Sequence, residues 1–212
     1  MKLYSLPPSP NSFKVVALAN HLGLELEVVA VDMMSGAHQQ PEYLAKNPNG
    51  TMPTLEDGDF CLWESNAILL YLAGKKPESG IMPADPRLQA QVHQWLHWQS
   101  NHWNPANRPF VYENMVKPMF HGQPPDPVAL EQATPEFHKR ASLLEKHLEQ
   151  SDYLVGNQLS VADFALAAGL VYAVPGRLPL ENYPKLRDYA ARVTRTEAFA
   201  KAVPPMPAGA KA

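Results

Sequence analysis

The sequence predicts an α/β domain of order βαβ-ββα, followed by an all-helical domain. Three observations lead to this prediction. Strand and helix patterns alternate over the first third of the chain, strand patterns end near Pro86, and the Pro- and Gly-containing stretch around residues 75–80 interrupts both. We therefore expect one domain over residues 1–76, a linker over 77–85 and a helical domain over 86–204.

The first three elements follow from short apolar patterns. Residues 2–5 predict a brief strand, and residues 26–31 are apolar enough to predict a strand in the interior of a sheet. Between them, a helical apolar face ends at Gly23, which favours a helix stop. That face is formed by Val15, Val16, Leu18, Ala19 and Leu22.

The next elements are a hairpin and a helix. Residues 54–56 and 60–62 flank Asp57-Gly58, a dipeptide that favours a two-residue hairpin turn. Ser65 then heads the apolar run of residues 67–73, which predicts a helix from Ser65 to about Gly74.

The rest of the chain predicts helices. Residues 88–103 and 130–150 carry helical apolar faces, and Pro105, Pro109 and Pro118 must bend or interrupt the segment between them. Ser160-Val161-Ala162-Asp163 resembles a capping box with Asp in place of Glu. Two shorter helices follow, and residues 204–212 should fray.

Composition excludes several classes of function. The net charge of −3 comes without a Lys/Arg stripe, so we expect no nucleic-acid partner. A single cysteine, Cys61, excludes a disulfide framework and fits a reducing compartment. The longest apolar run, residues 164–174, is too short for a bilayer, and residues 1–5 lack a signal sequence. We expect a soluble, cytoplasmic protein with no membrane contact.

Two histidines have the spacing of a zinc-protease helix. His93 and His97 lie four residues apart, but Gln94 stands where the acidic base would be and no third ligand is evident. We expect two histidines on a helix face and no metal.

Binding chemistry concentrates around Pro53 and Ser65. If the Met52–Pro53 bond is cis, the N–H and C=O of Met52 point outward, where they can pair with an extended peptide. Ser65 opens a helix, whose N–H groups form an anion site. A small acidic peptide would satisfy both halves of this unit.

These motifs, in this order, resemble the cytosolic glutathione transferases over nearly the whole chain. Residues 2–4 followed by Ser9 and Val15 are similar to serine-type members of the phi and theta kind. Residues 9–15 are also similar to the nu-class loop, in which a hydroxyl residue and an Asn stand near the thiol. The resemblance implies a thioredoxin-like first domain that holds glutathione, and it implies a homodimer.

The resemblance also implies roles for particular residues. Met52 would pair with the cysteinyl backbone across a cis Pro53, and Glu64 and Ser65 would hold the γ-glutamyl end. The glycyl carboxylate would lie near His38, Gln39 and Thr51. Two residues depart from the family pattern: Val or Ile is commoner at Met52, and Lys often stands at Gln39.

The thiol needs a hydrogen-bond donor, and three residues compete for that role. Ser9 is the first candidate, although it also suits an N-cap with Pro10 as the first helical residue. Asn11 and Ser12 are the rivals. Tyr4 lacks the pattern of tyrosine-type members, and Cys61 lies far from the first helix, so we expect neither to contact the thiol.

The predicted function is a glutathione transferase that conjugates the thiolate to a small apolar electrophile, as in detoxification. A peroxidase, dehalogenase or isomerase would use the same site, and a non-catalytic binding protein would use the same fold. Candidates for an apolar acceptor surface, most of them more typical of a helical core, are Trp98, His102, Trp103, Phe110, Tyr112, Met115, Met119 and Phe120.

Overall fold

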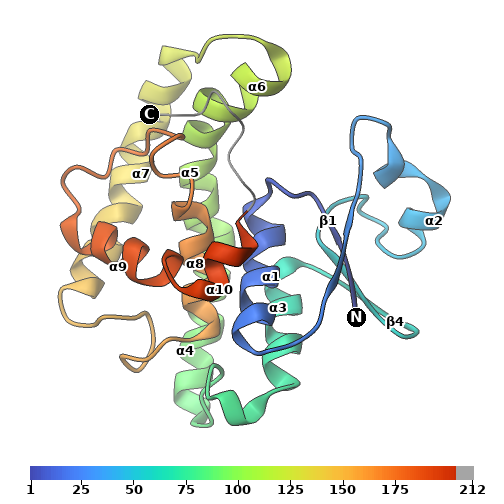
Figure 1. The fold of residues 1–212 in the computed structure, drawn as a ribbon. Helices are drawn as coiled ribbons and strands as arrows, with labels where there is room; N and C mark the ends of the chain where they lie inside the picture. Colours follow the sequence, from blue (N-terminus) through green and yellow to red (C-terminus); the bar gives the residue numbers. More distant parts are fainter. Residues whose placement is uncertain (204–212) are drawn as a thin grey trace. The chain divides into compact units, whose positions relative to one another are not determined.

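The computed structural model describes residues 1–203, which form two compact units (Figure 1). Unit 1 comprises Met1–Met82 together with a segment that begins at Arg195, and unit 2 comprises Pro83–Thr194. The division therefore falls inside the predicted linker 77–85. The short 3₁₀ helix η2 (Pro77–Ser79) precedes it.

Unit 1 has the predicted order βαβ-ββα. It contains β1 (Lys2–Ser5), α1 (Pro10–His21), β2 (Glu27–Ala30), β3 (Thr54–Asp57), β4 (Phe60–Trp63) and α3 (Ser65–Gly74). The connection from β2 to β3 carries the 3₁₀ helix η1 (Ala37–Gln39) and α2 (Pro41–Leu44). Figure 1 shows α1 and α3 on one face of the sheet and α2 beyond the other face.

The sheet has the order β2-β1-β3-β4. β1 pairs with β2 in parallel and with β3 antiparallel, and β3 pairs antiparallel with β4. The prediction that residues 26–31 form an interior strand is wrong, because β2 is an edge strand and three of its four residues are exposed. Its apolar side chains resemble those of a strand inside a parallel sheet, but β2 pairs with only one neighbouring strand, β1.

The hairpin turn lies one residue later than predicted. Asp57 pairs with Phe60, so the loop between the strands is Gly58-Asp59. Gly58 has φ +65°, the left-handed conformation that glycine adopts without steric cost. The Asp-Gly dipeptide thus places its glycine at the first loop position.

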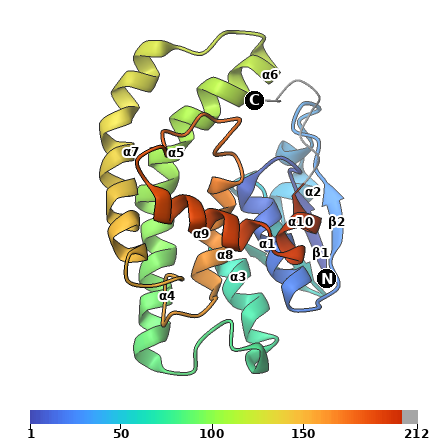
Figure 2. The ribbon, with the colours of Figure 1, turned by 60° about the vertical axis from the view of Figure 1, so that its left-hand side comes forward.

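The core of unit 1 lies between the sheet and its helices. Leu3 and Leu55 contribute from the sheet, where they face each other in the register of β1 and β3. A further helix, α10 (Glu197–Ala202), packs against α1 (Figure 2). Fully buried side chains of these helices are Val15, Leu18, Ile68, Leu69, Leu72 and Phe199.

Unit 2 is helical, as predicted, among the residues that the structure describes. It contains α4 (Pro86–Trp98), α5 (Asn104–Val111), α6 (Lys117–His121), α7 (Pro127–Leu148), α8 (Val161–Leu170) and α9 (Pro184–Thr194). Two π-helical turns, η3 (Gln99–Trp103) and η4 (Tyr112–Val116), join α4, α5 and α6. Pro105 and Pro118 each follow a π turn by two residues, as expected where a proline removes a helical donor.

The predicted capping box is confirmed at the start of α8. Asp163 Oδ2 accepts from the backbone N–H of Ser160 at 2.7 Å, and the Ser160 side chain caps in return. The same carboxylate accepts from the backbone N–H of Leu154 at 3.0 Å and from the Tyr189 hydroxyl at 3.0 Å. One buried carboxylate is therefore hydrogen-bonded to the start of α8, to the preceding loop and to α9.

Candidate functional site

The predicted site residues lie in segments that follow or precede strand ends at one end of the sheet, which we call the site edge. Tyr4 near the end of β1 pairs with Thr54 at the start of β3, and Thr54 pairs with Trp63 at the end of β4. At the other side of β1, Ser5 pairs with Ala30, the last residue of β2. The segments that run on to Ser9, His38 and Glu64 therefore begin at the same end of the sheet. The segment that contains Met52 enters β3 at this end.

The start of α1 separates the three thiol-contact candidates. Ser9 occupies the N-cap position, is half-buried, and makes no capping hydrogen bond to α1 within the described chain. Ser12 is buried, and its hydroxyl accepts a hydrogen bond from the Leu6 backbone N–H at 3.2 Å. Asn11 is half-buried, in the first turn of the helix. The geometry favours Ser9, because its hydroxyl is not engaged by the helix it precedes.

The Met52–Pro53 peptide bond is cis. Asn47, which sequence reasoning did not single out, holds the preceding loop: its amide donates to the Thr51 carbonyl at 2.8 Å and to Thr54 Oγ1 at 3.1 Å. The Tyr43 hydroxyl donates to the same Thr51 carbonyl at 2.6 Å. Thr51 is exposed, Met52 is half-buried and Pro53 is buried. The hydrogen bonds from Asn47 and Tyr43 fix the loop that leads into β3.

The residue before α3 adopts a backbone conformation that is rare for residues other than glycine. Glu64 has φ +71° and ψ +108°, and its side chain is exposed. Such a backbone costs of the order of 1–3 kcal/mol and persists where the surrounding structure requires it, often at binding sites. Ser65 follows as the first residue of α3 and is 9% exposed. The pair thus presents an accessible carboxylate beside a helix N-terminus.

The loop with His38 and Gln39 reaches Gly50. Gly50 has φ +59°, and a Cβ built on it would lie 2.6 Å from Gln39 Nε2 and 3.1 Å from the His38 carbonyl oxygen. Glycine therefore permits this close approach. Nδ1 of His38 is buried and has no hydrogen-bond partner among the described residues. An unpaired buried nitrogen is costly.

A buried cation lies behind this site. Lys14 on α1 is 1% exposed, and its Nζ donates a 2.6 Å hydrogen bond to Oδ1 of Asn66 on α3. Burial lowers the pKa of Lys14 to about 7, against an opposing effect of the Glu64 charge. Sequence reasoning missed Lys14 and Asn66. The available signal was a lysine four residues before Leu18, inside the apolar face of a helix.

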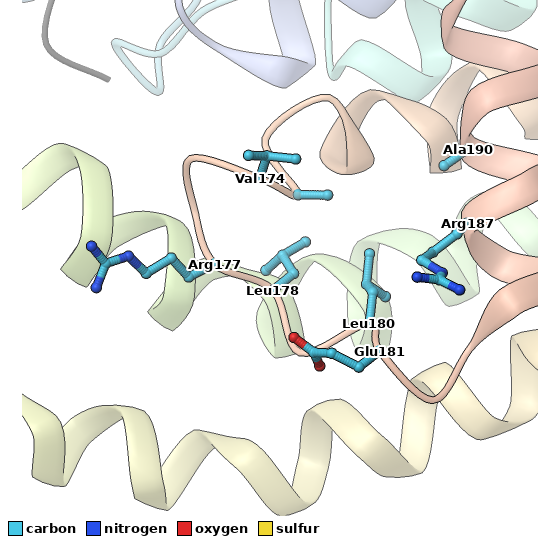
Figure 3. A pocket seen from close by; sticks show the side chains of 8 residues that line it. Val174, Arg177, Leu178, Leu180, Glu181, Arg187 and Ala190 are labelled. Carbon is cyan, nitrogen blue, oxygen red and sulfur yellow. The ribbon is translucent and has the colours of Figure 1, made fainter. Parts of the chain in front are cut away.

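Unit 2 contains a cavity of about 410 Å³ between the α8–α9 connection and α9. Figure 3 shows Val174, Leu178 and Leu180 along it, with the exposed side chains of Glu181 and Arg187 nearby. None of the predicted site residues lines this cavity. Its walls are mostly apolar, and it brings no nucleophile or general base to one point.

Among residues 1–203, no helix combines the length and apolar character that crossing a membrane requires. Over the same range, no three side chains of His, Cys, Asp or Glu are grouped so that they could hold a metal ion.

Comparison with known proteins agrees with this architecture. Residues 1–74 match the family model described as glutathione S-transferase, N-terminal domain, and residues 109–197 match the corresponding C-terminal domain model. Glutathione S-transferase 3 of Zea mays is 36% identical over 98% of this chain and 95% of its own.

Two solved structures extend the comparison. Glutathione transferase F7 of Populus trichocarpa has a TM-score of 0.87 at 32% identity, covering 95% of this chain and 96% of its own. A glutathione S-transferase I bound with lactoylglutathione also has a TM-score of 0.87, at 26% identity, covering 95% of this chain and 97% of its own.

Proposed function

This chain belongs to the glutathione S-transferase family and is a glutathione transferase, and we propose that unit 1 holds glutathione at the site edge. The supporting observation is that the end of β1, the start of β3 and the end of β4 lie side by side, directly before or after the segments that hold Ser9, Met52-Pro53 and Glu64-Ser65. The domain roles are part of the proposal: the N-terminal α/β unit binds the tripeptide, and the helical unit supplies apolar surface.

The tripeptide would bind as an extended strand. The backbone of Met52 would pair with the cysteinyl residue, beside Pro53. The ammonium of the γ-glutamyl end would meet the Glu64 carboxylate, and its carboxylate would meet the hydroxyl and N–H groups at Ser65. Three side chains would then surround the glycyl carboxylate, namely His38, Gln39 and Thr51.

Catalysis would come from stabilising the thiolate. A free thiol of this kind has a pKa of about 8.5, so only a few per cent is ionised at neutral pH. Lowering that pKa by about 2 units requires about 2.7 kcal/mol. A hydroxyl that donates to a charged acceptor contributes about 1.5–3 kcal/mol, and a helix N-terminus adds up to about 1 kcal/mol.

Ser9 would supply both contributions; its position at the N-terminus of α1, without a capping hydrogen bond to that helix, supports this role. It would act as a hydrogen-bond donor and would not ionise. Asn11, with a side-chain amide in the same turn, is the alternative donor. Ser12 is the weakest of the three, since its hydroxyl already accepts from Leu6.

The second substrate would be a small apolar electrophile. Of the aromatic and methionine residues considered from sequence, Trp103, Phe110 and Met115 are buried core, whereas Tyr112, Met119 and Phe120 are 39%, 42% and 52% exposed. These three exposed side chains would offer the acceptor surface. A role in detoxification in the cytoplasm is part of the proposal.

A homodimer is part of the proposal. β4 is an edge strand, and its Phe60 and Trp63 are 45% and 39% exposed, which is unusual for large apolar side chains at a free edge. Light scattering coupled to gel filtration should give twice the monomer mass. A monomer at micromolar concentration would contradict this part alone.

Initial rates with glutathione and an activated aryl halide test the proposed reaction. We expect saturable conjugation that requires both substrates. Calorimetry with glutathione alone should show one site per chain. Turnover of a hydroperoxide without conjugation would favour a peroxidase, and tight glutathione binding without any turnover would favour a carrier. Absence of glutathione affinity would reject the site.

A further inference from the structure

A lysine is buried beneath the start of α3. Lys14 is 1% exposed, although lysine is almost never fully buried unless its charge is paired. Its Nζ lies 2.6 Å from Oδ1 of Asn66, the second residue of α3. A neutral amide oxygen compensates only part of the cost of removing an ammonium from water.

The carboxylate of Glu64 provides an opposing charge. This charge acts on Lys14 by raising the lysine pKa, in opposition to the larger effect of burial. Glu64 also holds the backbone conformation with φ +71°, immediately before Ser65 and Asn66. Lys14 thus contacts the turn whose side chains are proposed to hold the γ-glutamyl end, and it does so from the interior of unit 1.

We propose that Lys14 is a positioning residue for the γ-glutamyl end of glutathione, acting through Asn66 and Glu64. This inference rests on the proposed function and adds a residue to it. The Nζ of Lys14 donates to Asn66, and Asn66 lies in the first turn of α3, next to Glu64 and Ser65.

Charge balance explains how Lys14, in its ammonium form, would favour the bound state. The γ-glutamyl end carries one ammonium and one carboxylate. Glu64 pairs with that ammonium, and the carboxylate then lies at a helix N-terminus with Lys14 behind it. The bound state holds two positive and two negative charges, so each charge that is removed from water has a counterpart. A neutral side chain at position 14 would leave one negative charge in excess.

The test compares glutathione affinity in Lys14→Met, Lys14→Arg and wild type. Methionine keeps the apolar stem and removes the charge. Calorimetry should show a dissociation constant about tenfold higher for Lys14→Met, the size of one charge-assisted contact. The KM for glutathione should rise in parallel, while kcat stays within about threefold, because the thiol end is untouched. Lys14→Arg should recover most of the affinity.

A double-mutant cycle separates positioning from a merely structural role. In a Glu64→Gln background, Lys14→Met should change the dissociation constant by less than about threefold, because the charge through which it acts is gone. Lys201→Met is the matched control, since Lys201 is an exposed lysine of unit 1 that pairs only with Glu197 in the described chain. It should leave affinity and rates unchanged.

Three outcomes would overturn the inference: unchanged affinity in Lys14→Met, an equal loss in both backgrounds, or a fall in kcat without a change in KM. If Lys14→Met does not fold, Lys14→Gln, which keeps a donor for Asn66 but no charge, carries the same test. Wild-type protein without glutathione affinity would instead reject the proposed function. Wild-type binding with an unaffected variant rejects this inference alone.

Discussion

The ammonium of the buried Lys14 on α1 donates a 2.6 Å hydrogen bond to the side-chain oxygen of Asn66 on α3. The two helices lie on the same face of the sheet (Figure 1). The bond therefore joins the helix that begins at Ser9 to the helix that begins at Ser65. Each of these two helices begins at a residue of the proposed site.

The buried lysine makes stability depend on pH. Burial lowers its pKa from 10.5 to about 7 in the folded chain. Between these values the unfolded chain binds more protons, so stability rises with pH across that window. Relative to Lys14→Met, wild type should gain about 2 kcal/mol in unfolding free energy from about pH 7 to about pH 9.

Urea unfolding of both proteins at the two pH values measures this difference. Lys201→Met should follow wild type at both, because its parent lysine is exposed. Parallel pH profiles for Lys14→Met and wild type would show that Lys14 keeps an ordinary pKa.

Ser9→Ala should lower the rate of conjugation about ten- to a hundredfold, which corresponds to the loss of one hydrogen bond to a thiolate. Glutathione affinity should change by less than about threefold, because the contacts at Met52, Glu64 and Ser65 remain. The apparent pKa in the pH profile of kcat/KM should rise toward that of free thiol.

Ser12→Ala and Asn11→Ala serve as matched controls for Ser9→Ala. Ser12→Ala removes an acceptor for the Leu6 N–H, so it should reduce stability more than rate. An undiminished rate in Ser9→Ala, with a loss in Asn11→Ala, would assign the donor role to Asn11.

Gly50→Ala should weaken glutathione binding several-fold and lower stability by about 1–2 kcal/mol. The new methyl group would meet Gln39 Nε2 at 2.6 Å and the His38 carbonyl oxygen at 3.1 Å, in addition to the strain of φ +59°. Both neighbours belong to the proposed glycyl subsite.

Gly58→Ala is the matched control for Gly50→Ala. Its φ is +65°, but a Cβ there would meet nothing within 4 Å. It should therefore show the backbone cost without the loss of affinity. Equal glutathione affinity in the two variants would argue against a role for the His38–Gln39 loop.

Asp163→Ala should lower the free energy of unfolding by about 3 kcal/mol, because it leaves several buried donors without an acceptor. These donors are the backbone N–H groups of Leu154 and Ser160 and the Tyr189 hydroxyl. Asp152→Ala, which removes an exposed ion pair with Arg192, should cost less than about 1 kcal/mol. Chemical unfolding monitored by circular dichroism compares them, and similar losses would contradict the prediction.

The sequence by itself determined the order of elements and the local starting points of the site. The helix that begins at Ser65 and the capping box at Asp163 were predicted correctly, because both depend on residues within one or two turns of each other. The local hairpin predicts that the segments of Met52 and Glu64 lie together, whereas only the family resemblance implied that Ser9 joins them.

Only the tertiary structure decided which side chains are buried and what they meet there. The apolar residues of β2 predict an interior strand, yet β2 is an edge, because strand order depends on segments that lie far away in the chain. The hydroxyl of Ser12 accepts a hydrogen bond from the Leu6 N–H, and the Nζ of Lys14 donates to Asn66, 52 residues away. Such contacts depend on packing between elements, which periodicity and propensity within one segment do not encode.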